Sequence, residues 1–449
     1  MKEAMKNILL FVAAMCLCSC GLYTRYERDD VSFTDSLYRR VSASEDTSSL
    51  ASLKWEELFT DPQLQRWIRI GVANNTDLNV ARLKVQEAEA ALLSSRWALL
   101  PGVSASVQGG TPGTLTAGFD VSWQADIFGR LRNARRGAAA ALEQSDAYRQ
   151  AVQTQLVAII ASSYYSLLML DQQLSISLRT LDNWEENIRT MEALKRAGKT
   201  NEAAVLQAKS NKLTVEGSVL NLRKQIMEME NSFSALLGVV PMGIQRGRIE
   251  DQVFPSALAE GVPAQLLSRR PDVRQAEMAL AEKFYMTNSA RAAFYPDLTL
   301  SGSLGWTNGA GAMVIDPAGI IAGVIGSLLQ PVFAKGANKA RLEIAKAQQE
   351  EAAFRFRQAI LDAGVEVNNA LMSWQTARER LEIDRKQVIT LRAAVWNTKL
   401  LMKHGITNYL EVLTAQQNLL QAELTEISDR YQEIQGVISL YHALGGGCY

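Results

Sequence analysis

The second half of the amino-acid sequence repeats the first half. Identical residues recur at an offset of 195 in one block, as in Asp77 and Asp272, and at an offset of 207 in a second block. The second block holds seven identities in fourteen positions, where composition alone would give about one. Its identical pairs are Gly198 and Gly405, Thr200 and Thr407, Asn201 and Asn408, Val205 and Val412, Leu206 and Leu413, Ala208 and Ala415, and Asn211 and Asn418. This interval exceeds any solenoid period, so the pattern predicts a tandem internal duplication of one large unit.

Each copy is expected to begin with a helix that continues into a strand hairpin. In the first copy, Asp61 and Pro62 form a typical cap and first turn, and the helical pattern runs to about Trp97. Apolar and polar residues then alternate over 103–108 and again over 115–127. This period of two predicts two antiparallel strands, each with one apolar and one hydroxyl-rich face.

Long helices follow the hairpin in each copy. The first copy has no proline between 130 and 196, and its apolar spacing predicts one helix there and another from about 201 to 237. The second copy is expected to form a helix at 263–293, strands at 298–306 and near 320–333, and helices at 336–403 and 407–444. The helix at 336–403 would extend roughly 100 Å, which no compact domain requires.

One segment of the second copy also suits a transmembrane helix. Residues 317–334 carry no charge and are mostly apolar. The corresponding stretch of the first copy, 115–128, contains Asp120 and Asp126 and alternates strictly. A strand is therefore the preferred prediction for both segments.

The N-terminus has the pattern of an export signal. Lys2 and Lys6 precede an apolar core at 8–15, which is too short for a permanent membrane span. The following Leu-Cys-Ser-Cys-Gly run resembles a bacterial lipobox, which predicts that Cys20 becomes the acylated first residue of the mature chain. An ordinary secretory signal rich in cysteine is the alternative.

Composition argues against several classes of function. The chain has 47 basic and 47 acidic residues, and this balance makes nucleic-acid binding unlikely. It has two histidines and four cysteines, and three of the cysteines lie before residue 21. These residues do not match the common ligand sets of structural metal sites. No catalytic triad, paired-carboxylate set or phosphate-binding loop is identifiable, so we expect no enzyme, no cofactor and no metal site.

Four strands per chain cannot close a membrane barrel. Closed barrels in outer membranes have at least about eight strands, and lipid does not tolerate an open strand edge. With an apolar face toward lipid and a hydroxyl-rich face toward a lumen, the chain is therefore expected to complete a barrel by oligomerising.

Five segments together resemble the outer membrane factor family of TolC-like channels, and the lipobox resembles that of the lipoprotein branch. The segments are 123–130 (WQADIFGR), 267–273 (LSRRPDV), 295–300 (YPDLTL), 330–333 (QPVF) and 405–413 (GITNYLEVL). The resemblance implies a mixed α and β membrane protein, a homotrimer with a twelve-stranded β-barrel continued by a long periplasmic α-helical barrel. It also implies two partners: a periplasmic adaptor and an inner-membrane pump, commonly of the resistance-nodulation-division class.

The expected function is that of a passive outer-membrane exit duct for small toxic molecules, driven by the pump. A type I protein-secretion duct is an alternative of similar build. A structural periplasmic coiled-coil lipoprotein is a third possibility, although such a tether has no use for lipid-facing hairpins. The expected domains are a signal peptide (1–19), an acylated extended segment (20–60), a first repeat (61–240), a linker (241–262), a second repeat (263–444) and a tail (445–449).

The candidate site residues fall into four groups. The alternation predicts that five barrel residues face lipid: Phe119, Val121, Trp123, Leu298 and Leu300. Cys20 is the lipidation site. Gly198 and Gly405 are expected at helical turns that dock the adaptor, or that serve only as helix caps. The resemblance implies that Glu411 forms a carboxylate ring at a periplasmic constriction, unless it is an ordinary solvated residue.

Other conspicuous residues are expected to have ordinary structural roles. The run 269–272 is explained by helix initiation at Pro271. Asp126 is expected to end a strand, and His404 is expected to be a solvated helix-end residue. His442 and Cys448 have no expected partner.

Overall fold

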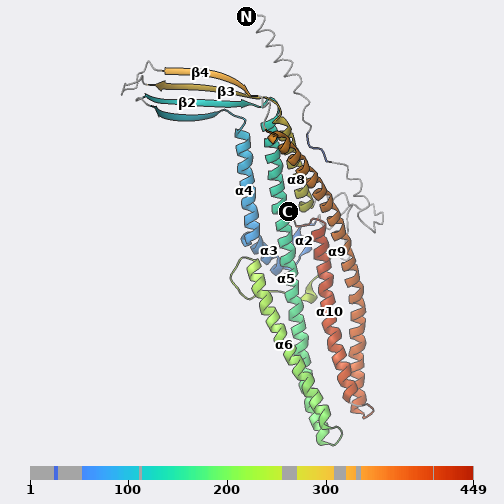
Figure 1. Ribbon diagram of the computed structural model, residues 1–449. Helices are drawn as coiled ribbons and strands as arrows, with labels where there is room; N and C mark the ends of the chain where they lie inside the picture. Colours follow the sequence, from blue (N-terminus) through green and yellow to red (C-terminus); the bar gives the residue numbers. More distant parts are fainter. Residues whose placement is uncertain are drawn as a thin grey trace. The chain divides into compact units, whose positions relative to one another are not determined.

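The computed structural model describes residues 25–28, 53–110, 114–254, 270–307, 320–329, 335–407 and 409–447. The elements of the first repeat are α3 (Pro62–Asn74), α4 (Thr76–Trp97), β1 (Gly102–Gly110), β2 (Thr114–Ala125), α5 (Arg130–Arg196) and α6 (Glu202–Leu236). The short helix α2 (Trp55–Leu58) precedes this repeat, and the 3-10 helix η4 (Ile249–Asp251) follows it. The second-repeat elements are α8 (Pro271–Ala292), β3 (Asp297–Thr307), β4 (Ile320–Leu329), α9 (Ala337–Lys403) and α10 (Tyr409–Ala443) (Figure 1).

The element lengths reproduce the internal repeat. Helices α4 and α8 each have 22 residues, α5 and α9 each have 67, and α6 and α10 each have 35. Each copy thus folds in the order helix, strand, strand, long helix, shorter helix. The predicted duplication is confirmed at the level of secondary structure. The described part of the uncharged segment, 320–329, forms strand β4 rather than a transmembrane helix.

The first expected helix is interrupted once. The Asp61 side chain accepts a hydrogen bond from the Gln63 backbone N–H and starts α3, as predicted. The helix ends before Asn75, whose backbone is extended. The Asn75 side chain accepts from the Leu78 N–H, which starts α4, and donates to the Leu236 carbonyl oxygen. One buried amide therefore divides the predicted helix in two because it satisfies backbone groups of two elements.

The chain forms two compact units, and each repeat contributes to both. The first unit comprises the described parts of Met1–Ser32, Ala81–Arg149 and Asp272–Ala359. It contains an antiparallel four-stranded sheet in the order β1-β2-β3-β4. The second unit comprises the described parts of Phe33–Val80, Gln150–Pro271 and Ile360–Tyr449. In this unit α6 runs back along the end of α5, and α10 runs back along α9 (Figure 1).

The second unit is held together by apolar packing and by a polar connector. Trp67 of α3 donates its indole N–H to the Gln245 carbonyl oxygen at 2.8 Å. Arg246, in the same connector, pairs with Asp171 of α5 and Glu230 of α6. One 18-residue stretch of α5 has the length and apolarity of a membrane span, but half of it is buried within the chain. We interpret that stretch as part of the helical core.

Candidate functional site

The register of the sheet determines which side chains share a face. Phe119 lies opposite Ala105 and Leu304, and Trp123 lies opposite Leu300. Since directly paired residues project to the same side and alternate residues share a face, the five predicted lipid-facing residues lie on one face. All but the half-buried Leu298 are exposed in the single chain. A contiguous exposed apolar face of this kind indicates a surface that meets lipid or another protein.

The opposite face of β1, β2 and β3 is small and polar. Ser104, Asp120 and Ser303 form one row across the strands, and the Ser106 hydroxyl donates to an Asp120 carboxylate oxygen at 3.1 Å. The described strands carry two carboxylates, Asp120 and Asp297, and no basic residue. This face therefore has the character expected of an aqueous lumen with a negative bias.

Strand β4 departs from the predicted alternation. Ile325 pairs with Ser301 and Leu329 pairs with Asp297, so both apolar residues lie on the hydroxyl-rich face. Leu328 lies on the other face. The expectation of one apolar and one polar face is thus correct for β1 to β3 and wrong for β4. Because β4 is an edge strand of the sheet, its side chains have strand neighbours within the chain on one side only.

At the base of the sheet, the sequence segment 123–130 contacts the segment 295–300. Gln124 and Arg130 of the first repeat hold the two carboxylate oxygens of Asp297 at 2.9 and 2.8 Å. The Phe128 ring stacks on the Tyr295 ring with centroids 4.8 Å apart. These contacts give a physical reason for both motifs, because they fix the junction between the strands and the long helix α5.

Asp126 directly follows the last residue of β2, as expected, and it also has a role that was not predicted. Its carboxylate accepts hydrogen bonds from the Leu131 and Arg132 backbone N–H groups at 3.0 and 2.8 Å. These are the first free amide groups of α5, so Asp126 caps that helix across the positive-φ turn at Gly129. The simpler prediction of a strand end missed this cap because the acceptor is five residues before the first donor.

Gly198 and Gly405 occupy equivalent turns at the ends of α5 and α9. Their φ angles are 70° and 73°, in the left-handed region that favours glycine. Lys199 donates its backbone N–H to the Leu194 carbonyl oxygen, and Ile406 donates to that of Leu401. This pattern is the Schellman cap expected for each helix. A Cβ atom added at either glycine would meet nothing within 4 Å, so both turns are open to a partner.

Glu411 is exposed on the first turn of α10. Tyr409, Val412 and Leu413 are buried in a cluster with residues of α5 and α6. At 100° per residue these three point to one side of α10, whereas Glu411 points to the opposite side. The carboxylate is therefore placed away from the packed core.

Arg270 makes a buried connection that the sequence did not indicate. Its guanidinium donates to the Ala443 carbonyl oxygen at 2.7 Å and pairs with a Glu366 carboxylate oxygen at 2.7 Å. His442, for which no partner was expected, lies 3.1 Å from the other Glu366 oxygen. Pro271 does begin α8 as predicted, but helix initiation alone does not explain Arg270.

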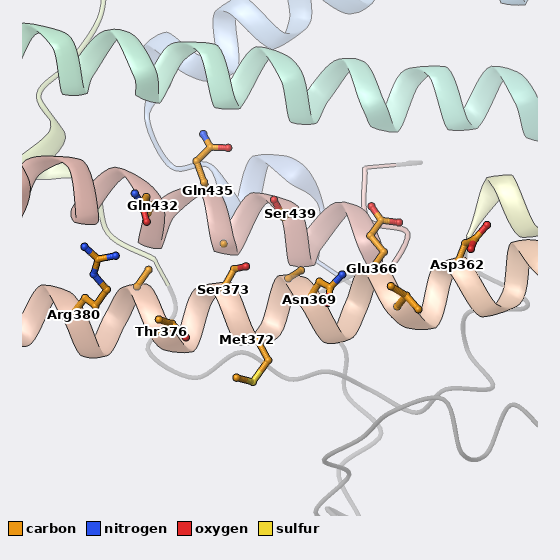
Figure 2. A pocket seen from close by; sticks show the side chains of 14 residues that line it. Asp362, Glu366, Asn369, Met372, Ser373, Thr376, Arg380, Gln432, Gln435 and Ser439 are labelled. Atoms are coloured by element: carbon orange, nitrogen blue, oxygen red, sulfur yellow. The ribbon is translucent and has the colours of Figure 1, made fainter.

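Glu366 also lines a groove of about 890 Å³ between α9 and α10, shown in Figure 2. Burial by itself would raise the pKa of Glu366, but the hydrogen bond from His442 and the charge of Arg270 lower it to about 2. Glu366 therefore remains a carboxylate under ordinary conditions.

A buried carboxylate joins three helices. Glu423 of α10 pairs with Arg179 of α5 at 3.0 Å and with Arg392 of α9 at 2.8 Å. The Glu423 side chain is about one-tenth exposed. Local sequence patterns do not indicate this link, because the two arginine partners of Glu423 lie 244 and 31 residues away along the chain.

The described part of the N-terminal segment is short and well anchored. Arg28 makes two hydrogen bonds of 2.7 Å to the carboxylate of Glu277 on α8, and the Tyr26 ring packs edge-on against Phe284. Cys20, Cys448 and the sequence motifs at 267–269 and 330–333 lie outside the described residues. Within the described ranges, no group of His, Cys, Asp and Glu side chains has the arrangement of a metal site.

Comparison with known proteins gives one consistent assignment. The protein family described as "Outer membrane efflux protein" matches residues 67–239 and 262–446. The cation efflux system protein CusC of Escherichia coli is 28% identical over 98% of this chain and 99% of its own length. The toluene efflux pump outer membrane protein TtgC of Pseudomonas putida is 29% identical over 99% of this chain and 96% of its own.

Solved structures agree with these sequence relatives. The outer-membrane channel OprN superposes with a TM-score of 0.87 and 28% identity, covering 95% of this chain and 99% of that chain. The open state of the Neisseria gonorrhoeae MtrE outer membrane channel superposes with a TM-score of 0.85 and 26% identity, covering 95% of this chain and 98% of that chain. The predicted combination of four strands and long helices in one chain is confirmed by this likeness.

Proposed function

The chain belongs to the outer membrane efflux protein family, and we propose that it is the exit duct of a tripartite efflux assembly. The observation that carries this proposal is the four-stranded sheet with an exposed apolar face, followed in each repeat by a 67-residue helix. Such a chain provides both a lipid-facing wall and a tunnel wall. The family consists of channels, which gives no support to a catalytic role.

The duct is a homotrimer in this proposal. Strands β1 and β4 are the free edges of the sheet, and lipid does not tolerate unpaired strand edges. Three copies joined edge to edge make twelve strands, which is within the range of closed membrane barrels. The lumen is then lined by the small polar side chains of β1 to β3, and the helices continue the passage into the periplasm.

Small molecules are the favoured cargo. The relatives are named for efflux of cations, toluene and antibiotics or for export of pyoverdine, none of which is a protein. A type I protein-secretion duct of similar build is therefore the second candidate. We propose that transport is passive in this chain, and that an adaptor and an inner-membrane pump of the resistance-nodulation-division class supply selection and energy.

Crosslinking in intact cells tests the assembly directly. The chain, purified from native membranes after crosslinking, should bring with it an adaptor and an inner-membrane transporter. Deleting the chain should then raise intracellular accumulation of that transporter's small-molecule substrates. Recovery with a protein-secretion ATPase would instead identify the secretion duct, and recovery of no transporter would contradict both candidates.

We predict that Cys20 carries the lipid anchor, because it ends the lipobox-like run after the apolar signal core. The mature protein should begin at Cys20 and carry the mass of its acyl chains, whereas Cys20→Ser should lose this mass entirely. Several acyl chains at about 0.8 kcal/mol per buried CH₂ would hold the segment firmly on the membrane. Intact mass spectrometry decides the question. Cys18→Ser is the matched control and should retain acylation, and an unmodified wild-type chain beginning elsewhere would refute the prediction.

We predict that the open turns at Gly198 and Gly405 dock the adaptor. Gly405→Leu should weaken adaptor binding about tenfold or more, because its side chain fills the approach path, while trimer yield falls less. The left-handed backbone also costs about 1–2 kcal/mol with any L-side chain, so trimer yield must be measured in parallel. Gly217→Leu, at a helical glycine with similarly open surroundings, is the control. Export that falls only in proportion to trimer amount would leave the two glycines as helix caps.

We predict that Glu411 forms a ring of three carboxylates at the periplasmic constriction. Such a ring favours cations and repels anions, so Glu411→Gln should lower the cation-to-anion permeability ratio about twofold or more. Single-channel recording in planar bilayers measures this ratio. Glu228→Gln, on the exposed surface of α6, should leave the ratio unchanged. If Glu411→Gln also leaves selectivity and conductance unchanged, Glu411 is an ordinary solvated residue.

A further inference from the structure

A groove of about 950 Å³ lies between the two helical ends of the second unit. One wall comes from the end of α5 and the turn that follows it. The other wall comes from the end of α9 and the start of α10. A space of this size accommodates a peptide side chain with part of its backbone rather than a single small ion.

The groove is rich in positive charge that lacks a partner within the described part of the chain. Lys199, Lys399 and Lys403 contribute to its lining, together with His404. Of the described residues, Glu186 supplies the one carboxylate in the lining, and no described carboxylate lies within ion-pair distance of the three lysines. Other lysines of the same region are paired, as Lys195 is with Glu202 and Lys209 is with Glu192. The unpaired lysines therefore give the groove an affinity for anions.

Two buried hydroxyl groups beside the groove also lack partners. Tyr409 is 7% exposed, and neither its hydroxyl nor that of Thr407 has a hydrogen-bond partner among the described residues. A buried hydroxyl without a partner loses its hydration without compensation, so native structures rarely leave one unmatched. Burial raises the pKa of Tyr409, which keeps the hydroxyl protonated and able to donate.

We propose that this groove binds an acidic side chain of the periplasmic adaptor, with the three lysines attracting the carboxylate and the Tyr409 and Thr407 hydroxyls donating to it. The inference rests on the proposed docking role of the helical ends and specifies its chemistry. The two hydroxyls thereby gain the acceptor that they lack in the free chain.

The position of the charges favours a polypeptide carboxylate over a free anion. Lys199 comes from the first repeat, whereas Lys399 and Lys403 come from the second, so an occupant bridges two helical ends. The open glycine turns at Gly198 and Gly405 border the same region and allow close approach of a backbone. An adaptor segment seated there would also hold the two ends in one relative arrangement.

Replacing the three lysines with neutral residues tests the electrostatic contribution to adaptor binding. The adaptor recovered by crosslinking is produced separately, and its affinity for purified trimers is measured against ionic strength. The triple variant Lys199→Gln, Lys399→Gln, Lys403→Gln should bind about tenfold more weakly at low salt and show a flatter salt dependence. Lys224→Gln, an exposed lysine on α6 outside the groove, should bind as the wild type does.

Tyr409→Phe separates binding from folding. Because the hydroxyl has no partner among the described residues of the free chain, its removal should leave the melting temperature of the trimer unchanged or slightly raised. The same variant should bind the adaptor about tenfold more weakly, since it removes a hydrogen bond to a charged acceptor. A purely structural role for the hydroxyl would instead lower thermal stability and leave affinity unchanged for the folded trimer.

The outcomes distinguish this inference from the proposed function. Variants that bind the adaptor as tightly as the wild type would overturn the carboxylate groove and leave the duct intact. Unchanged adaptor affinity with altered ion selectivity would show that the lysines face the pore, and would also overturn the groove. If the adaptor binds neither the wild type nor any variant, docking at the helical ends is itself refuted.

Discussion

A lysine at Val121 is expected to cost about 2–4 kcal/mol per chain if the residue lies near the bilayer midplane. Val121 shares the exposed apolar face with Phe119, and the same penalty is expected for Phe119→Lys. Three copies multiply the effect in a trimer, so almost no folded trimer should be recovered from membranes. Trimer yield on a non-denaturing gel measures the result.

The neighbouring residue supplies a matched control. Ser122 lies next to Val121 at nearly the same depth but on the opposite face, in a row with Ser301. A lysine at Ser122 would project into water and should reduce trimer yield little. The same tolerance is expected at Thr116. Similar yields from Val121→Lys and Ser122→Lys would mean that both faces meet the same environment, which would contradict a membrane barrel.

Replacing Arg270 with methionine is expected to destabilise the chain by about 2 kcal/mol, because the buried Ala443 carbonyl group loses its donor and the half-exposed Glu366 carboxylate loses its partner. The Arg270 side chain is 6% exposed, and it supports both Glu366 and the last carbonyl group of α10. Urea unfolding or the melting temperature in detergent measures the loss. Arg274→Met, one helical turn later at a largely exposed ion pair with Glu143, should cost much less.

The effect of Arg270→Met should depend on pH. The pKa of Glu366 is lowered in the folded chain. Its contribution to the free energy of unfolding is therefore fully present above pH 4.5, the ordinary pKa of a glutamate, and is lost as the pH falls through about 2. The stability difference between wild type and Arg270→Met should therefore narrow between about pH 5 and pH 2. Equal effects of Arg270→Met and Arg274→Met at neutral pH would show that Arg270 is only a surface residue.

The architecture could be predicted from the sequence, because the signals for strands, helices and turns are periodic and local. A period of two identified the strands, long proline-free helical stretches identified α5 and α9, and glycine identified the turns at Gly198 and Gly405. The duplication added an independent check, since each copy had to fold in the same way. The alternation of 115–127 thus supported the strand now seen as β4, although β4 itself does not alternate.

The long-range polar contacts could not be predicted from the sequence and are seen only in the folded chain. Arg270 binds a carbonyl group 173 residues away, and Glu423 joins helices from both repeats. Local patterns relate such residues only to their immediate neighbours, which is why the sequence predicts helix initiation at Arg270 and no partner for His442. The break at Asn75 belongs to the same class, because its amide also serves Leu236 in a different helix. Propensity and periodicity act over a few residues, whereas these contacts exist only after packing brings distant segments together.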